Sequence, residues 1–225
     1  MNFRGNKVNT LSFNEQPVYR AFFNGNSVFP ELSEATTHPT SALTSNTAPS
    51  PYRVYYSSYY SNTYAAWKAF TNAVHTQGWA SCSNNKNGTA WIALDLGNGN
   101  KIRDVKVILS NRNNTNVNGP NNIAIFGTNT APTNGGTSSF TEIPSDAVIL
   151  GSFTGLDGSA KSQEYVLDCV GNETTNCTRE EYAQHINNAM KYGFRYIIIA
   201  STSWNQSGGA YLSIGCIKIN GRLEN

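Results

Sequence analysis

The side chains most often used in catalysis are sparse in this sequence and show no catalytic spacing. The three histidines, His38, His75 and His185, lie far apart along the chain. There is no GxSxG nucleophile elbow and no phosphate-binding P-loop, and no paired-carboxylate motif stands out among the 14 acidic residues. Two carboxylates from distant segments can still meet across a cleft, so a glycosidase is the enzymatic alternative. The pattern favours a protein that is not an enzyme.

The cysteines give no metal-binding pattern either. The sequence has four, Cys82, Cys169, Cys177 and Cys216, and none has the CxxC spacing with histidine neighbours that indicates zinc. Cys169 and Cys177 are near enough in sequence to close a short loop by a disulfide. Free buried thiols are the alternative in a reducing compartment. We expect no cofactor.

Side chains suited to non-covalent binding occur in polar segments. Arg112 lies among asparagines in the segment SNRNNTN, which is rich in hydrogen-bond donors and acceptors, although a solvated turn would look the same. Trp204 is flanked by Ser, Asn, Gln and Gly, which predicts an exposed ring. The tyrosine-rich segment from residue 52 allows two interpretations. Its rings either fill the core, or Tyr59, Tyr60 or Tyr64 lies in a loop and offers a stacking face.

These loops need strands to hold them, and the sequence predicts several. In the segment WIALDLG, Ile92, Leu94 and Leu96 alternate with Trp91, Ala93 and Asp95, the pattern of a half-buried strand that ends at Gly97. Residues 195–200 are apolar on both faces, which predicts a central strand. Further strands are expected near residues 105–109, 123–128, 147–153, 164–167 and 211–221, the last with a bulge at Gly215-Cys216.

One helix is expected, over residues 178–192. Thr178 and Glu181 match a capping box, Tyr182, Ile186 and Met190 share one helix face, and Gly193 is placed to end the helix.

Composition and charge limit the classes of partner that the protein can have. Of the 225 residues only 13% are charged, against about 25% in an average protein, and the net charge is +2. No basic run occurs, so we expect neither nucleic acid nor an anionic membrane as a partner. No apolar run reaches the length of a membrane span, and no apolar segment follows the first residues as in a signal peptide. We therefore expect synthesis in a cytosol without export by the general route.

The N-terminal region contains a short repeat. FNEQPVY at residues 13–19 is echoed ten residues later by FNGNSVF, and each copy reads as strand, asparagine-centred turn, strand. Residues 1–30 are therefore predicted to form a small β-meander that needs a partner surface. Residues 31–51 are rich in Pro, Ser and Thr and are predicted to be a linker or an extended arm that lies on the surface. The main domain is placed at residues 52–225.

The central motifs resemble those of a known family. The turn Ala69-Phe70-Thr71-Asn72, then Trp79, then the segment WIALDLG occur in the order found in discoidin-like domains, also called coagulation-factor type C or galactose-binding-like domains. The resemblance covers roughly residues 50–221. It implies an all-β fold, a discoidin-like β-sandwich jelly roll, to which the small N-terminal β-meander and one inserted helix are added. Such domains rarely carry catalysis.

The resemblance also implies a ligand site. Members that bind sugars use loops at one end of the sandwich, with planar donors for the hydroxyls and an aromatic ring for the apolar sugar face. Matched residue by residue, the candidate ligand-binding residues are His75, Arg112, Asn116, Trp204 and Tyr211. The family often holds a structural calcium ion, but Thr71 and Gly215 stand where its acidic ligands are expected. We therefore predict no metal.

The N-terminal repeat resembles docking segments of bacteriophage tail and baseplate proteins. With the sandwich, this resemblance implies a virion protein, present in several copies, that binds a glycan or polysaccharide of the host surface and other virion proteins through residues 1–30. A structural decoration, collar or baseplate protein that makes only protein contacts is the alternative.

Overall fold

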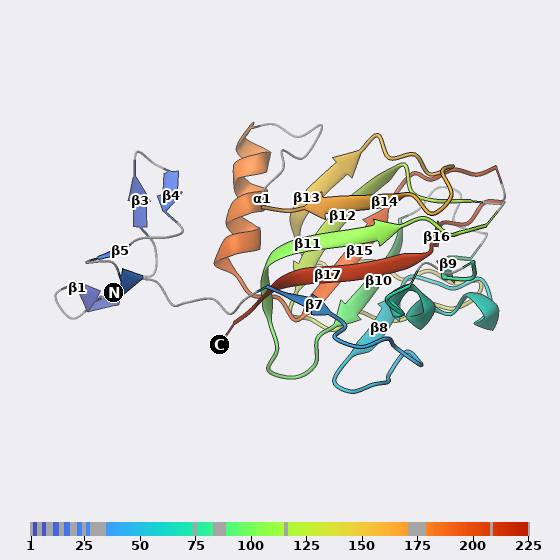
Figure 1. The fold of residues 1–225 in the computed structure, drawn as a ribbon, viewed down its shortest axis with the longest axis horizontal. Coiled ribbons are helices and arrows are strands. Elements are labelled where there is room, and N and C mark those ends of the chain that lie inside the picture. Colours follow the sequence, from blue (N-terminus) through green and yellow to red (C-terminus); the bar gives the residue numbers. More distant parts are fainter. Residues whose placement is uncertain are drawn as a thin grey trace.

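Two antiparallel β-sheets stack on each other in the computed structural model of this chain (Figure 1). The structure describes residues 35–73, 76–82, 89–114, 117–170, 179–207 and 209–224, together with six short strands between residues 2 and 27. The five-stranded sheet has the order β13 (Val148–Thr154), β12 (Asn122–Thr128), β15 (Tyr196–Ser201), β10 (Ala90–Asp95) and β8 (Arg53–Tyr56). The four-stranded sheet has the order β14 (Glu164–Asp168), β11 (Ile102–Ser110), β17 (Cys216–Leu223) and β7 (Thr36–His38). The predicted all-β sandwich is confirmed.

The main core lies between the two sheets. Ile92 and Leu94 of β10 and Val107 and Leu109 of β11 are completely buried there. Burying a side chain of this size contributes roughly 1.5–3 kcal/mol, so these alternating positions are the main reason the strands pair as they do. The central place of β15 in its sheet, predicted from its two apolar faces, is also confirmed.

The second face of β10 is buried as well, although the sequence predicts a half-buried strand. Trp91 and Ala93 of β10 form a smaller core with Ile198 and Ala200 of β15. The segment between β12 and β13 covers it, and the indole Nε1 of Trp91 donates to the carbonyl of Thr141 at 2.8 Å. Strand alternation alone does not reveal a covering loop, because Trp91, Ala93 and Asp95 look like an outward face in the sequence.

β10 ends at a carboxylate that is 0% exposed. Asp95 accepts hydrogen bonds from Nε and Nη2 of Arg195, at 2.7 and 2.9 Å, and from the backbone N–H of Gly97 at 2.8 Å. The hydrogen bond with Asp95 raises the pKa of Arg195. Gly97 has φ of +89°, and a Cβ there would lie 2.4 Å from Pro51 Cβ. The Asp-Leu-Gly ending is therefore set by an ion pair and a turn that only glycine fits.

Residues 36–51, which the sequence assigns to a linker, pack on the sandwich. β7 pairs with β17, and Leu43 is 2% exposed within the main core. His38 is buried, with Nδ1 3.0 Å from the hydroxyl of Tyr52 and Nε2 2.9 Å from Oγ1 of Thr36. Each anchoring residue is isolated in a polar sequence, so the composition of this stretch conceals it. The sandwich begins at residue 36, before the predicted boundary at residue 52.

Acid should destabilise the folded protein through two buried histidines. Burial lowers the pKa of His38 and of His185, in the second case despite the opposing charge of Glu181. Between the lowered pKa and the ordinary value of about 6.5, the unfolded chain binds more protons than the folded chain, so the free energy of unfolding falls as the pH falls. We expect the melting temperature to drop on acidification below about pH 6.5, and less steeply in His38→Gln. Thermal melts over a pH series test this; equal slopes for both chains would contradict it.

The predicted helix is present as α1 (Arg179–Lys191), which packs against β13 and β11 at one end of the sandwich (Figure 1). It ends before Gly193, as expected. Thr178 of the predicted capping box, and the side chains of Tyr182, Ile186 and Met190, lie outside the described residues.

The predicted irregularity at Gly215 is a strand break. β16 (Ser213–Ile214) pairs with β9 (Trp79–Ala80), and the chain then crosses into β17 of the four-stranded sheet. The N–H of Gly215 donates to the carbonyl of Ser110 at 2.8 Å, and a Cβ at Gly215 would lie 2.6 Å from the carbonyl oxygen of Asn111. Glycine is therefore required at residue 215, because the segments around Gly215 and Asn111 approach each other closely.

The described residues of the N-terminal region form three two-stranded antiparallel hairpins. β3 (Leu11–Phe13) with β4 (Gln16–Val18), and β5 (Phe22–Phe23) with β6 (Asn26–Ser27), correspond to the predicted repeat. β1 (Asn2–Phe3) with β2 (Asn6–Lys7) is a further hairpin that the sequence motif did not reveal. Among the described residues, no helix has the length and apolar character needed to cross a membrane.

The described cysteines carry free thiols. Cys82, Cys169 and Cys216 are buried, and burial raises the pKa of Cys169 and Cys216. Cys169 is therefore not in the disulfide that the sequence left open, while Cys177 lies outside the described residues.

Candidate functional site

Of the five residues proposed from the sequence, the structure describes three. Arg112 and Tyr211 lie near each other at the end of the sandwich where β11 ends and β9 and β16 pair, and Trp204 is in a neighbouring loop. His75 and Asn116 lie outside the described residues, so their placement as site residues stays a prediction.

The predicted exposure of Trp204 is wrong. Its exposed fraction is 5% and it belongs to the main core. The backbone pairs with Pro120, and Asn205 donates from its N–H to the carbonyl of Gly119 and from Nδ2 to that of Val117. These bonds hold the polar neighbours outward and turn the ring inward. Among the described residues, no acceptor pairs with the buried Nε1 of Trp204.

Arg112 is also buried, with an exposed fraction of 1%, so its side chain does not lie in the solvated turn that the sequence allowed. Its Nε donates to the carbonyl of Thr76 at 2.8 Å, and its guanidinium carbon lies 4.7 Å from the centre of the Tyr64 ring. A guanidinium stacks on aromatic faces and keeps its donors in one plane, so it fixes a ring and a loop together. Arg112 therefore holds the Tyr64 ring and the loop at Thr76 in place at this end of the sandwich.

Three tyrosines from two distant segments meet beside Arg112, and we call Tyr60, Tyr64 and Tyr211 the tyrosine platform. The ring of Tyr60 lies 5.8 Å from that of Tyr64 and 5.1 Å from that of Tyr211, measured between centres. Tyr60 is 45% exposed, and the other two are half-buried. Aromatic pairs at such distances hold one another in place, so the platform offers a ring surface that is already ordered.

Short local structures set the platform. The 3₁₀ helix η1 (Asn62–Tyr64) closes with a hydrogen bond from the N–H of Tyr64 to the carbonyl of Ser61, and the N–H of Tyr60 donates to the carbonyl of Ala80. Gly209 has φ of +141°, and a Cβ there would lie 2.6 Å from the Tyr211 ring. The position of the Tyr211 ring therefore depends on a glycine at residue 209, which leaves room for it.

A lysine joins this group from the 3₁₀ helix η2 (Ala66–Phe70). Nζ of Lys68 donates to the carbonyl of Thr63 at 2.7 Å and to Oε1 of Gln77 at 2.9 Å, and it lies 5.7 Å from the centre of the Trp67 ring. Lys68 thus connects η1 to the loop before β9. The sequence reasoning missed it, although Lys68 is the one charged residue between Arg53 and Lys86.

Both interpretations of the tyrosine-rich segment hold for different residues. Tyr52, directly before β8, is 6% exposed and belongs to the core. Tyr60 and Tyr64 lie beyond β8 in the loop and form the platform. Trp79 is completely buried, and its Nε1 donates to the carbonyl of Ser58 at 3.1 Å, which anchors that loop.

The described residues do not fit the calcium ion that the family resemblance implies. Thr71 occupies the position of an acidic ligand, and its hydroxyl donates to the carbonyl of Lys68. No group of three His, Cys, Asp or Glu side chains that could hold a metal occurs among the described residues. Calcium prefers several anionic oxygens, which the turn at residues 69–72 lacks.

The best-buried carboxylates serve structure. Asp95 pairs with Arg195, Glu224 with Arg103, Asp168 with Lys106 and Asp104 with Arg222. None of these pairs belongs to the segments that form the platform. The arrangement at the platform can therefore hold a ligand by ring contacts and hydrogen bonds, without one of these four carboxylates beside it.

No protein-family model matches the sequence, and no curated protein matches it. Several solved structures are similar in fold. The family 32 carbohydrate-binding module of C. perfringens NanJ, in complex with galactose, has a TM-score of 0.47 at 10% identity, covering 75% of this chain and 93% of that chain. Chitosan-binding module 1 of a Paenibacillus sp. IK-5 chitosanase/glucanase has a TM-score of 0.48 at 15% identity, covering 80% and 97%. An F5/8 type C domain of a Bacteroides fragilis protein has a TM-score of 0.48 at 10% identity, covering 77% and 93%.

Proposed function

We propose that this protein is a non-catalytic glycan-binding protein whose ligand contacts the tyrosine platform. The observation that carries the proposal is the meeting of Tyr60, Tyr64 and Tyr211 at one loop end, with Arg112 stacked on the ring of Tyr64. A sugar ring has an apolar face that packs on an aromatic ring and hydroxyls that bond to planar donors and acceptors. The family resemblance of the sequence points to the same end of the sandwich.

Such a site binds weakly. A few ring contacts on an open surface correspond to a Kd on the order of millimolar, or about −4 kcal/mol. Useful attachment then requires several copies acting together, because linked sites raise the overall affinity by orders of magnitude. The proposal therefore includes display in multiple copies.

Two alanine variants test the platform. We expect Tyr60→Ala and Tyr211→Ala to reduce glycan binding by roughly tenfold each with little change in melting temperature, because truncating a central aromatic contact often costs more than 1 kcal/mol. Tyr192→Ala is the matched control, since Tyr192 is 47% exposed, close to the 45% of Tyr60, and lies beside α1 at the other end. Binding is measured on a glycan array and by titration. Equal binding by Tyr60→Ala, Tyr211→Ala and the control would refute the site.

We also propose the setting implied by the N-terminal repeat: a bacteriophage virion, assembled in the host cytoplasm, in which residues 1–30 dock the protein to its neighbours. The three hairpins support it, because two-stranded hairpins are marginal alone and gain stability from a partner surface.

A truncation tests the docking. A chain that starts at Ala35 keeps β7 and Leu43, so we expect it to melt like the full chain but fail to join the assembly. A chain that starts at Tyr52 loses both. We expect its free energy of unfolding to fall by about 2–5 kcal/mol or more, since truncating one buried leucine typically costs that much. Normal assembly of the Ala35 chain would overturn the docking role. A docking protein that binds no glycan would instead be a purely structural virion component.

A further inference from the structure

Charge is distributed unevenly over the sandwich. Residues 35–94 contain no Asp or Glu but include Arg53, Lys68 and Lys86. This stretch forms β7, β8, η1, η2 and β9, the blue to green elements at the lower right of Figure 1. The stretches that contain Arg112 and Tyr211, residues 105–141 and 182–223, are also free of acidic residues. All the loops that carry the platform therefore lack a carboxylate of their own.

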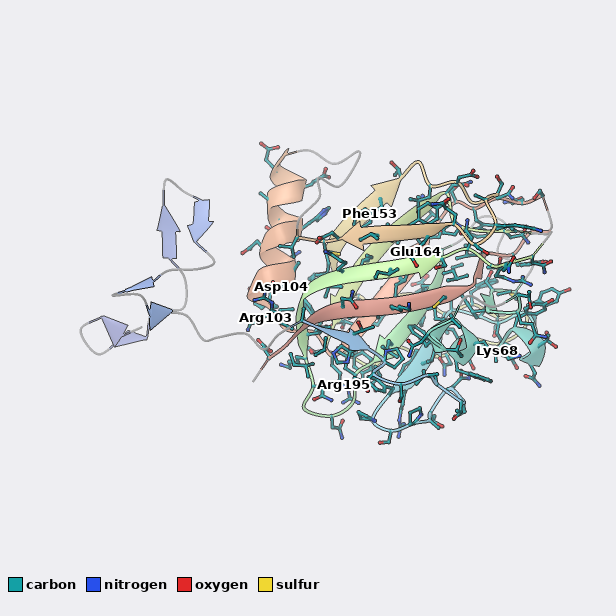
Figure 2. The ribbon with its side chains drawn as sticks, viewed as in Figure 1. Lys68, Arg103, Asp104, Phe153, Glu164 and Arg195 are labelled. Carbon is teal, nitrogen blue, oxygen red and sulfur yellow. The ribbon has the colours of Figure 1, made fainter. Side chains whose placement is uncertain are left out.

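The two cations at the platform have only neutral partners among the described residues. Lys68 is held by a carbonyl and an amide oxygen, and Arg112 by a carbonyl and the Tyr64 ring. The cations in the four described ion pairs, such as Arg103 and Arg195, instead face carboxylates. Figure 2 shows Lys68 and the Arg103 region at opposite ends of the sandwich. Because no described carboxylate pairs with either side chain, the platform carries an uncompensated positive charge.

Two acidic residues of neighbouring segments, Asp157 and Glu164, have local partners of their own. Asp157 lies in the loop whose carbonyls accept from Asn111, but its carboxylate is occupied by Ser159, and Lys161 follows in the same loop. Glu164 begins β14 opposite Ser110, and Glu164 and Lys218 act with opposite signs on the pKa of Cys216. Each of these carboxylates thus has a lysine close by in its own part of the surface.

We propose that the glycan bound at the tyrosine platform is anionic, with a carboxylate or phosphate group attracted by Lys68 and by the buried charge of Arg112. This inference rests on the proposed function and names its ligand class. Arg112 has little exposed surface, so it acts through its field and by positioning Tyr64, while Lys68 contacts the anion. A charge held beside low-dielectric walls acts more strongly than one in bulk water, and salt screens it over about 8–10 Å.

Matched pairs of probes test the charge preference. They are polygalacturonate against its methyl ester, sialyllactose against lactose, and a phosphorylated mannan against the dephosphorylated polymer. We expect the charged member of at least one pair to bind roughly tenfold more tightly, as for one hydrogen bond to a charged group. The first two pairs report a carboxylate and the third a phosphate. The preference should shrink as ionic strength rises from about 0.02 to about 0.5 M.

A charge variant completes the test. Lys68→Gln should lower the ratio of charged-probe to neutral-probe affinity to about one, whatever its effect on binding as a whole, and Lys68→Arg should keep the ratio of the unaltered chain. Lys101→Gln, at an exposed lysine beside α1, is the control. Melting temperatures of the variants separate a loss of folding from a loss of charge. The salt dependence of binding by the unaltered chain tests the charge preference without any variant. If no pair shows a charge preference, the inference is overturned; binding of neutral glycans would then leave the proposed function standing, and binding of none would remove both.

Discussion

Trp204→Ala is expected to destabilise the fold by about 3–5 kcal/mol, the usual cost of removing a buried tryptophan from a core. The exposed fraction of Trp204 is only 5%, and its ring lies in the main core. In a chain of this size such a loss lowers the melting temperature by roughly 10 °C. Thermal or urea denaturation measures it.

Trp204→Phe provides the control. Phenylalanine keeps most of the buried ring and removes an N–H that finds no acceptor among the described residues, so its cost should be well below that of alanine. A Trp204→Ala chain with unchanged stability and lost glycan binding would show instead that the ring faces the ligand.

Arg195→Met is expected to cost about 3 kcal/mol or more, because it leaves the Asp95 carboxylate buried without its charged partner. Asp95 has a side-chain exposure of 1%, while that of Arg195 is 28%. Asp95→Asn should therefore cost less, since the remaining arginine can reach water. Denaturation of the two single variants checks the order of these effects.

The double variant separates the ion pair from the rest. Combining Arg195→Met with Asp95→Asn removes the buried charge. The double variant should therefore lose less stability than the sum of the two single losses. Strict additivity would show that the two side chains do not act together, in conflict with the two hydrogen bonds that join them.

Much of the fold follows from the sequence. The alternation in WIALDLG, the apolar run at residues 195–200 and the helix at residues 179–191 are local patterns, and each predicts an element that the structure contains. β7 was missed because a three-residue edge strand carries no periodicity, and its anchors, His38 and Leu43, are isolated in a polar stretch.

The site was predicted less well than the fold. Arg112 and Tyr211 lie at one loop end, whose role as a ligand site stays a prediction, and the burial of Arg112 and Trp204 depends on contacts with segments far away in sequence. Polar neighbours do not determine exposure, because a loop can hold its polar backbone outward and its ring inward. The tyrosine platform needs Tyr60 and Tyr211, whose rings lie 5.1 Å apart, to meet across about 150 residues, which no local pattern shows.

The direction in which the chain enters the sandwich affects how it would bear force. Thr36 pairs with Gly221, and Ile102 with Leu223, at one end of β17, whereas Ser110 pairs with Cys216 at the platform end. β11 has nine residues, so the two ends are about 30 Å apart. A pull between a ligand on the platform and an anchor before β7 therefore runs along the strands. It loads the hydrogen bonds between β7 and β17 together, in shear, instead of opening them one at a time.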